Sequence, residues 1–296
     1  MRVVGLVSSP RRGGNSELAV KEILSRLPED WEKNMIRLNE LDIKYCRACY
    51  ACLPEGKKCG IKDDLDFLVR NIKHADKVVI AAPAYMLGAH TALKVILDRL
   101  ISLVSDHRIF GRPDCVIVNS FGMADWEGMV REDTLLFARK LHLNVIAQEV
   151  ILATLPGDSV KGENLEKLAK LAEMLQSDNP QAGGNVYTTT QKDLLRCPFC
   201  SGTEMQIKPD GWVKCGVCGG EGKLVSGADG LKIEYEPGFI HRLTPEGLDI
   251  HTDYLIEKKQ LFLDTKDEVK AIQARYKDID WWRRPEKPEE KNKNSH

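Results

Sequence analysis

The sequence predicts an α/β protein, with a doubly wound, five-stranded parallel sheet over residues 1–176 and a smaller module after it. In this first part, short apolar runs alternate with longer segments whose apolar residues recur every three or four positions. Strict alternation of strands and helices favours right-handed crossovers, and therefore a parallel sheet with helices on both faces. We expect the strand order 2-1-3-4-5, with ligands at the carboxyl ends of the strands.

Five runs rich in valine, isoleucine and leucine are the expected strands, because they are too continuous for sheet faces exposed to water. They are Val3–Val7, Asn34–Leu38, Lys77–Ala82, Cys115–Asn119 and Leu143–Leu152. The amphipathic segments that follow them are the expected helices. These are Ser16–Leu27, Asp63–His74, Ala89–Val104, Glu127–Leu141 and Gly162–Leu175. Each strand is thus followed by one helix, as crossover connections require.

The chain after residue 176 divides into four further parts. A linker rich in turn-forming residues covers 177–192, a cysteine-containing module covers 193–225, an α+β extension covers 226–284 and a charged tail covers 285–296. We expect the tail to be disordered, because it lacks apolar residues to bury. Within the extension, Thr265 begins a capping-box pattern that predicts a helix through Val269, Ile272 and Tyr276.

The composition excludes several classes of protein. The chain has 43 basic and 44 acidic side chains and a net charge of −1, so a nucleic-acid partner is not expected. No apolar run approaches the ~20 residues needed to cross a bilayer. Arg2 leads directly into the first strand, without a secretory signal. We therefore expect a soluble, cytoplasmic protein whose nine cysteines stay reduced.

The segment from Ser9 to Ser16 has the properties of a phosphate-binding loop, because it ends at a predicted helix start. A helix N-terminus offers unpaired N–H groups and a positive dipole. The glycine spacing is that of neither the dinucleotide fingerprint nor the Walker loop, so a capped turn without a ligand is the alternative. The expected contributors are short donors, one forked charge and a glycine that permits close approach: Ser9, Asn15, Ser16, Arg11 and Gly14.

Two segments resemble the NADPH-dependent FMN reductase group of the flavodoxin-like proteins, and the resemblance covers roughly the first 175 residues. The first is Ser9-Pro10-Arg11-x-x-Gly14-Asn15-Ser16, and the second is Pro83-Ala84-Tyr85-Met86-Leu87-Gly88, followed by Leu93-Lys94 and Asp98-Arg99. The resemblance implies that FMN binds with its phosphate at the first segment and its isoalloxazine ring against the second. It also implies a third contact after the fourth strand, at Ser120, Phe121 and Gly122. No side chain is expected to act as a catalytic acid or base.

The first cysteine group, Cys46, Cys49, Cys52 and Cys59, has the pattern C-x2-C-x2-C-x6-C and follows the second strand. Closely spaced cysteines wrap one face of a compact loop, as a cubane cluster requires, whereas zinc sites use two separated knuckles. The pattern resembles the iron–sulfur flavoproteins, which implies that these cysteines hold a [4Fe-4S] cluster. We expect it at the same sheet edge as the phosphate loop, near the FMN of this or an adjoining subunit. Thiols with a redox or structural role and no cluster are the alternative.

The second cysteine group consists of two C-x2-C knuckles separated by 14 residues: Cys197, Cys200, Cys215 and Cys218. Each knuckle offers two thiolates from one tight turn, and a short hairpin between the knuckles completes a tetrahedral site. The pattern resembles a zinc ribbon, and we expect a zinc ion with a structural role. Rubredoxin-type iron is the alternative, because the same four thiolates can hold a one-electron centre.

Together these motifs predict an FMN-dependent oxidoreductase that passes electrons between FMN, a [4Fe-4S] cluster and an external redox partner. The expected donor is a ferredoxin-like protein or NAD(P)H, and the resemblance implies a homo-oligomer, either a dimer or a tetramer. Two alternatives remain. One is an NAD(P)H-dependent FMN or quinone reductase without a cluster. The other is a flavin-containing redox-sensing module that binds a partner through the ribbon.

Overall fold

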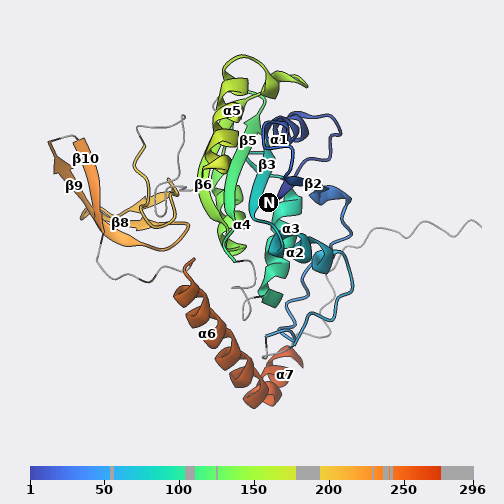
Figure 1. Ribbon diagram of the computed structural model, residues 1–296. Helices are drawn as coiled ribbons and strands as arrows, with labels where there is room; N and C mark the ends of the chain where they lie inside the picture. Colours follow the sequence, from blue (N-terminus) through green and yellow to red (C-terminus); the bar gives the residue numbers. More distant parts are fainter. Residues whose placement is uncertain are drawn as a thin grey trace, which may run out of the picture. The chain divides into compact units, whose positions relative to one another are not determined.

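Five parallel strands form the main sheet of the computed structural model, which describes residues 1–53, 57–103, 111–124, 126–177, 194–228, 230–235, 240 and 243–274. They are β1 (Arg2–Val7), β2 (Glu32–Arg37), β3 (Lys77–Tyr85), β5 (Asp114–Phe121) and β6 (Asn144–Leu152). Their order is β2-β1-β3-β5-β6 and every neighbouring pair is parallel (Figure 1). This is the order 2-1-3-4-5 along the chain, so the predicted fold class is confirmed. A short strand, β4 (Gly88–Ala89), pairs antiparallel with the end of β3.

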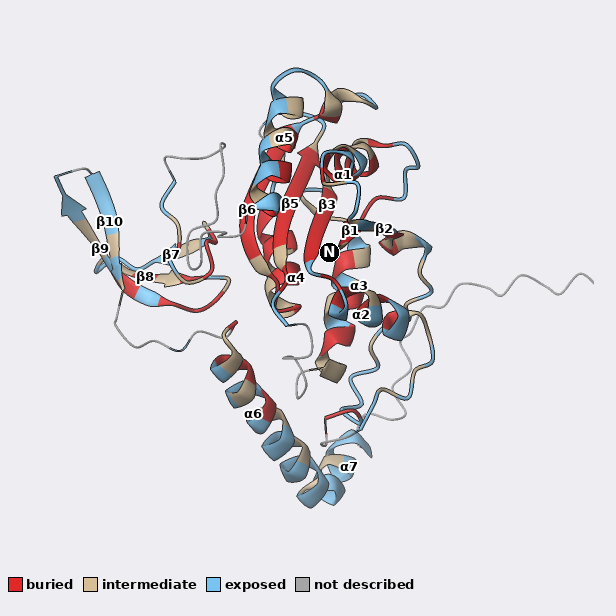
Figure 2. Ribbon diagram, viewed as in Figure 1, coloured by how far each residue is buried: buried red, intermediate tan, exposed pale blue. Residues whose placement is uncertain are grey.

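Helices cover both faces of this sheet. They are α1 (Asn15–Ser25), α2 (Leu65–Lys73), α3 (Thr91–Arg99), α4 (Val130–Lys140) and α5 (Gly162–Gln176). Because successive strand side chains point to opposite faces, Val3 and Val7 pack with α1 and α5, whereas Val4 and Leu6 pack with α2, α3 and α4. Figure 2 shows that β1, β3, β5 and β6 are almost entirely buried, and that the helices are buried along one side only; the edge strand β2 has a single buried residue, Ile36.

A second sheet carries the second cysteine group. Its strands are β7 (Met205–Ile207), β8 (Trp212–Cys215), β9 (Glu221–Gly227) and β10 (Gly230–Tyr235). They are antiparallel in the order β10-β9-β8-β7, so the sheet continues past residue 225. The predicted linker lies outside the described residues, except for Ser177.

The chain forms two compact units, Met1–Asp253 and Tyr254–His296. The predicted C-terminal helix is present as α7 (Lys266–Ala274). Thr265 does not cap it, because its hydroxyl donates to the carbonyl of Leu261 in α6 (Pro245–Asp264), a helix that the sequence pattern did not indicate. Tyr276 and the charged tail lie outside the described residues. Within the described part of the chain, no helix combines the length and apolarity needed to cross a bilayer.

Candidate functional site

A pocket of about 210 Å³ lies at the carboxyl ends of β1, β3, β5 and β6, where a doubly wound sheet places its ligands. Three loops that are far apart in the sequence meet there, together with the segment after β6. The lining residues are Ser9, Arg11, Gly14, Asn15, Ser16, Pro83, Ala84, Tyr85, Ser120, Phe121, Gly122, Ala153 and Thr154. Met86, Leu87 and Gly88 do not line this pocket, because they form the turn just beyond it. Ala153 and Thr154 were not indicated by the sequence.

The loop from Ser9 to Ser16 surrounds the N-terminus of α1. Gly14 is the N-cap residue of α1, and no side chain caps the amides of the first turn of this helix. A Cβ atom on Gly14 would lie 3.1 Å from the carbonyl oxygen of Arg11, so the backbone turns tightly there. Gly13 has a φ of +66°, in the left-handed region that favours glycine. Uncapped first-turn amides beside the positive end of the helix dipole fit an anion such as a phosphate.

An ion pair that the sequence did not indicate braces this loop from β2. Arg37 donates to Glu17 at 2.7 Å and to the carbonyl oxygen of Ser9 at 3.2 Å. Glu17 also accepts from the backbone N–H of Gly13 at 2.6 Å and pairs with Lys21. Hydrogen bonds from Lys21, Arg37 and the Gly13 N–H, in that order, lower the pKa of Glu17 to about 2. A glutamate in the first turn of a predicted helix was the available signal.

Asn15 lies in the pocket wall, but its side chain joins two loops. Its Nδ2 donates to the carbonyl oxygens of Ala153 and Leu155 at 2.9 and 3.0 Å. The hydroxyl of Thr154 donates to the carbonyl oxygen of Gly122 at 2.7 Å, which closes the same side of the pocket. The side-chain amide of Asn15 is therefore occupied, and its backbone N–H is the group that remains for a phosphate.

The turn between β3 and β4 presents two apolar residues in a strained backbone conformation. Met86 and Leu87 have φ angles of +49° and +63°, which cost non-glycine residues ~1–2 kcal/mol each, and both side chains are exposed. The start of α4 holds this turn. The N–H of Met129 donates to the carbonyl oxygen of Leu87 at 2.8 Å, and the N–H of Ala89 donates to Asp133 at 2.8 Å. Strain that is maintained by neighbouring groups is typical of ligand-contact segments.

The first cysteine group lies in the segment between β2 and α2, referred to as the first cysteine loop. Ala48 and Tyr50, which separate the first three cysteines, both have left-handed backbones, with φ angles of +48° and +52°. The N–H of Ala48 donates to the sulfur of Cys46 at 3.4 Å. Burial raises the pKa of the Cys52 thiol, and the other three thiols, that of Cys59 most, raise it further.

The spacing of these thiols differs from that of a single-ion site. Four sulfurs at about 2.3 Å from one zinc ion lie about 3.8 Å from one another. Among the residues that the structure describes, only the second cysteine group brings three or more metal-ligating atoms within 4.8 Å of one another. A cubane takes each thiolate at a different iron and so needs a wider set. Four thiols on one short segment are the donor set that a [4Fe-4S] cluster takes.

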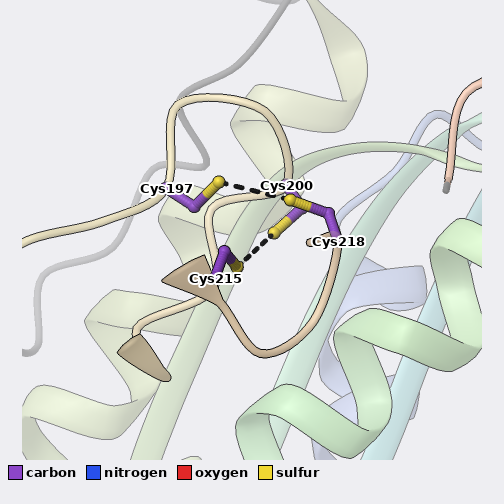
Figure 3. A group of neighbouring side chains, drawn as sticks. All are labelled: Cys197, Cys200, Cys215 and Cys218. Carbon is purple, nitrogen blue, oxygen red and sulfur yellow. Dashed lines mark hydrogen bonds between the residues drawn. The ribbon is translucent and has the colours of Figure 1, made fainter. Parts of the chain in front are cut away.

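The second cysteine group is a closed, tetrahedral arrangement (Figure 3). All four side chains are buried. The sulfurs of Cys197 and Cys218 are 3.4 Å apart, and those of Cys200 and Cys215 are 3.6 Å apart. Hydrogen bonding with Cys200, above all, lowers the pKa of Cys197. The separations are close to the ~3.8 Å edge of a tetrahedral thiolate site, so the group fits one metal ion.

The two knuckles of this group repeat the same backbone pattern. In each, the N–H two residues beyond the second cysteine donates back to its sulfur: Gly202 to Cys200, and Gly220 to Cys218, both at 3.4 Å. In each knuckle, the residue between the second cysteine and this donor glycine has a left-handed backbone: Ser201 with a φ of +64° and Gly219 with a φ of +82°. Such N–H···S bonds stabilise thiolate charge and orient the ligands. The repeated pattern is therefore that of a metal-binding hairpin.

Comparisons with known proteins agree with this geometry. Residues 1–155, just over half of the chain, match the NADPH-dependent FMN reductase family. An iron-sulfur flavoprotein of Methanocaldococcus jannaschii is 37% identical over 100 residues, which are 33% of this chain and 51% of that protein. An iron-sulfur flavoprotein of Archaeoglobus fulgidus is 26% identical over 200 residues, which are 66% of this chain and 90% of that protein.

A solved structure of a flavone reductase shares the fold over nearly the whole chain. Its TM-score is 0.74 at 21% identity, over 97% of this chain and 100% of that one. The match to the M. jannaschii relative, in contrast, spans about half of the relative's length. The family resemblance of the loops after the first and third strands is confirmed by the match over residues 1–155. The chain therefore belongs to the NADPH-dependent FMN reductase family, a family of flavin-dependent oxidoreductases.

Proposed function

We propose that this chain is an FMN-dependent oxidoreductase that exchanges electrons with a [4Fe-4S] cluster on Cys46, Cys49, Cys52 and Cys59. The observation that carries the proposal is the segment with four cysteines between β2 and α2 of a chain that belongs to a flavin-dependent family. The names of the two curated relatives, both iron-sulfur flavoproteins, support it. When bound, FMN supplies two-electron chemistry and the cluster supplies one-electron chemistry.

The residues around the pocket fit FMN. The first-turn amides of α1, with Ser9, Arg11 and Ser16, would hold the phosphate. The segments Pro83–Gly88 and Ser120–Gly122 would contact the isoalloxazine ring. At about 210 Å³, the pocket is smaller than sites that enclose a drug-sized ligand, which take ~300–1,000 Å³. A flavin held there would therefore keep part of its ring open to a redox partner.

The second cysteine group would hold a structural zinc ion. Its four buried thiols have the separations of a tetrahedral site, and a closed site of four cysteines is typical of structural zinc. The same donors could hold a rubredoxin-type iron, which would give the ribbon an electron-transfer role.

The first cysteine loop runs from beside the phosphate loop to the last residue of α3. It begins beside the phosphate loop, where Arg12 pairs with Glu40 at 2.7 Å. Cys59, however, lies against Arg99 at the far end of α3, a nine-residue helix about 13 Å long. Cys59 therefore lies at the opposite end of α3 from the flavin segment that precedes this helix. Proximity to the FMN of an adjoining subunit remains a prediction.

Stopped-flow reduction of the bound flavin tests the proposed function. Cys49 is exposed, so Cys49→Ala removes one cluster ligand with little effect on packing. We expect the variant to keep FMN, because the pocket residues are unchanged, and to lose most of its flavin reduction by reduced ferredoxin. Cys115→Ala is the matched control, because it removes a buried thiol of β5 outside both groups. Equal rates in the wild type and Cys49→Ala with both ferredoxin and NAD(P)H would contradict the proposal.

A second candidate function, direct hydride transfer from NAD(P)H to a flat aromatic acceptor, is favoured by apolar side chains beside the pocket. Tyr85 lines the pocket, and Met86, Leu87, Met123 and Trp126, which are near the lining residues in the chain, are exposed. Exposed apolar residues next to a concave site are typical of ligand-binding surfaces. Rapid flavin reduction by NAD(P)H in both the wild type and Cys49→Ala, followed by reoxidation with a quinone or flavone, would select this candidate.

A further inference from the structure

Arg99, the last residue of α3, is one of the most deeply buried side chains among the described residues. It is only 1% exposed. An arginine at the end of an amphipathic helix is expected to face solvent, where it complements the helix dipole. A buried guanidinium is unfavourable unless its N–H groups are paired. The partners of Arg99 therefore have to account for its burial.

The guanidinium of Arg99 contacts residues at both ends of the first cysteine loop, Lys44 before it and Asp63 after it. Its Nη1 donates to the carbonyl oxygen of Lys44 at 2.9 Å and forms a close contact with the buried carboxylate of Asp63. Asp63 in turn accepts from the backbone N–H groups of Lys44 at 3.0 Å and Leu65 at 3.2 Å. Lys44 precedes the first cysteine and Asp63 follows the last, so these bonds hold the base of the loop closed.

The other guanidinium nitrogen reaches the sulfur of a cysteine. Nη2 of Arg99 lies 3.6 Å from Sγ of Cys59 and 3.4 Å from Oδ1 of Asp63. Cys59 is separated from the other three cysteines by the longest spacing in the group. Its place beside them therefore depends more on contacts from outside the loop. Arg99 supplies such a contact, and it carries a positive charge.

We infer that Arg99 is a positioning residue for the cluster: it holds the Cys59 thiolate as the fourth ligand and favours the reduced cluster. Hydrogen bonds to the sulfurs and the net charge around a cluster set its reduction potential. A cation that donates to a ligand sulfur stabilises the more negative, reduced state, and so raises the potential. This inference rests on the proposed function, because it requires the cluster on the first cysteine group.

Two variants and one control test this role. Arg99→Lys keeps the charge, but one ammonium cannot reproduce the forked contacts to Lys44, Asp63 and Cys59. Arg99→Met combined with Asp63→Asn removes the whole ion pair without leaving a buried charge. Lys94→Met is the control, because it removes a cation of the same helix that is exposed and pairs with Asp98. Each anaerobic protein is assayed for iron, sulfide, FMN and thermal unfolding, and its cluster potential is measured by EPR-monitored titration.

We expect both Arg99 variants to keep FMN and to shift the reduction equilibrium of the cluster at least tenfold toward the oxidised state, or about 59 mV for one electron. Loss of iron and sulfide, with FMN and thermal unfolding retained, would equally support the positioning of Cys59. Lys94→Met is expected to behave as the wild type. Full cluster content with the wild-type potential in Arg99→Lys would overturn the inference, even where the double variant fails to fold. A wild-type protein without iron and sulfide would overturn the proposed function as well.

Discussion

At the scale of single residues, Glu17 organises the phosphate loop through charge. It joins Arg37 of β2, Lys21 of its own helix and the backbone of Gly13. The pKa of Glu17 is lowered from 4.5 to about 2 by these partners. A carboxyl with a lowered pKa stabilises the fold fully above its unfolded pKa, and this contribution is lost as the pH falls through the folded value. The window for Glu17 is therefore about pH 4.5 to 2.

Glu17→Gln is expected to lower the free energy of unfolding by about 1–2 kcal/mol at pH 7, because it removes the charge that Arg37 and Lys21 share. The difference from the wild type should shrink as the pH falls from 4.5 toward 2. Denaturant unfolding of both proteins at several pH values measures this. Glu22→Gln is the control, since it breaks only a helix-surface pair with Arg26. A difference that stayed constant down to pH 2 would show that Glu17 acts through packing and not through charge.

The residue scale is also where prediction from the sequence was weakest. Arg99 and Cys59 are 40 positions apart, and Arg37 and Glu17 are 20 apart. No local pattern links such pairs, because their contacts arise only when the crossovers are formed. Asn15 was expected in the loop just before a helix that starts at Ser16, whereas α1 starts at Asn15 itself; its side-chain partners beyond β6 depend on the same tertiary arrangement.

At the scale of elements, prediction worked where burial determines the sequence. Four of the five strands, β1, β3, β5 and β6, were identified because both faces of a parallel sheet are covered, which requires continuous valine and isoleucine runs; the edge strand β2 is only partly buried. The helix α6 was not indicated, because much of its apolar content is exposed, as at Ile250 and Tyr254, and forms no single buried stripe. The expected helix Ala89–Val104 is shorter in the structure, because α3 ends at Arg99 and the chain continues as a 3-10 helix over Leu100–Leu103.

We expect the antiparallel sheet of β7, β8, β9 and β10, the ribbon, to fold only when a metal is bound by its four cysteines. Cys215→Ser removes one of four buried thiols. The free energy of zinc binding at a structural site contributes directly to the free energy of folding. We expect the variant to lose zinc and the hydrogen-exchange protection of β8 and β9, while FMN binding stays within about twofold of the wild type. Cys49→Ala provides the matched control, because it removes a thiol from the other group. Loss of FMN from Cys215→Ser would show instead that the ribbon completes the flavin pocket.

At the scale of the whole molecule, two sheets present two different cysteine groups. The parallel sheet carries the pocket at its strand ends and a segment with four cysteines after β2. The antiparallel sheet carries four buried thiols that converge on one point. The sequence spacing distinguished the two groups, because ligands from one compact loop and ligands from two knuckles follow different patterns. The contact of Cys59 with Arg99 at the end of α3 required the structure.

The most direct test of this account is the iron, sulfide, zinc and FMN content per chain of anaerobically purified protein, together with its visible and EPR spectra. We predict about four irons, four sulfides, one zinc and one FMN, with a signal of a reduced cluster after dithionite. Cys49→Ala should lose the iron and sulfide and keep the zinc and FMN. One FMN per chain without iron or sulfide, or a single iron without sulfide, would contradict the account.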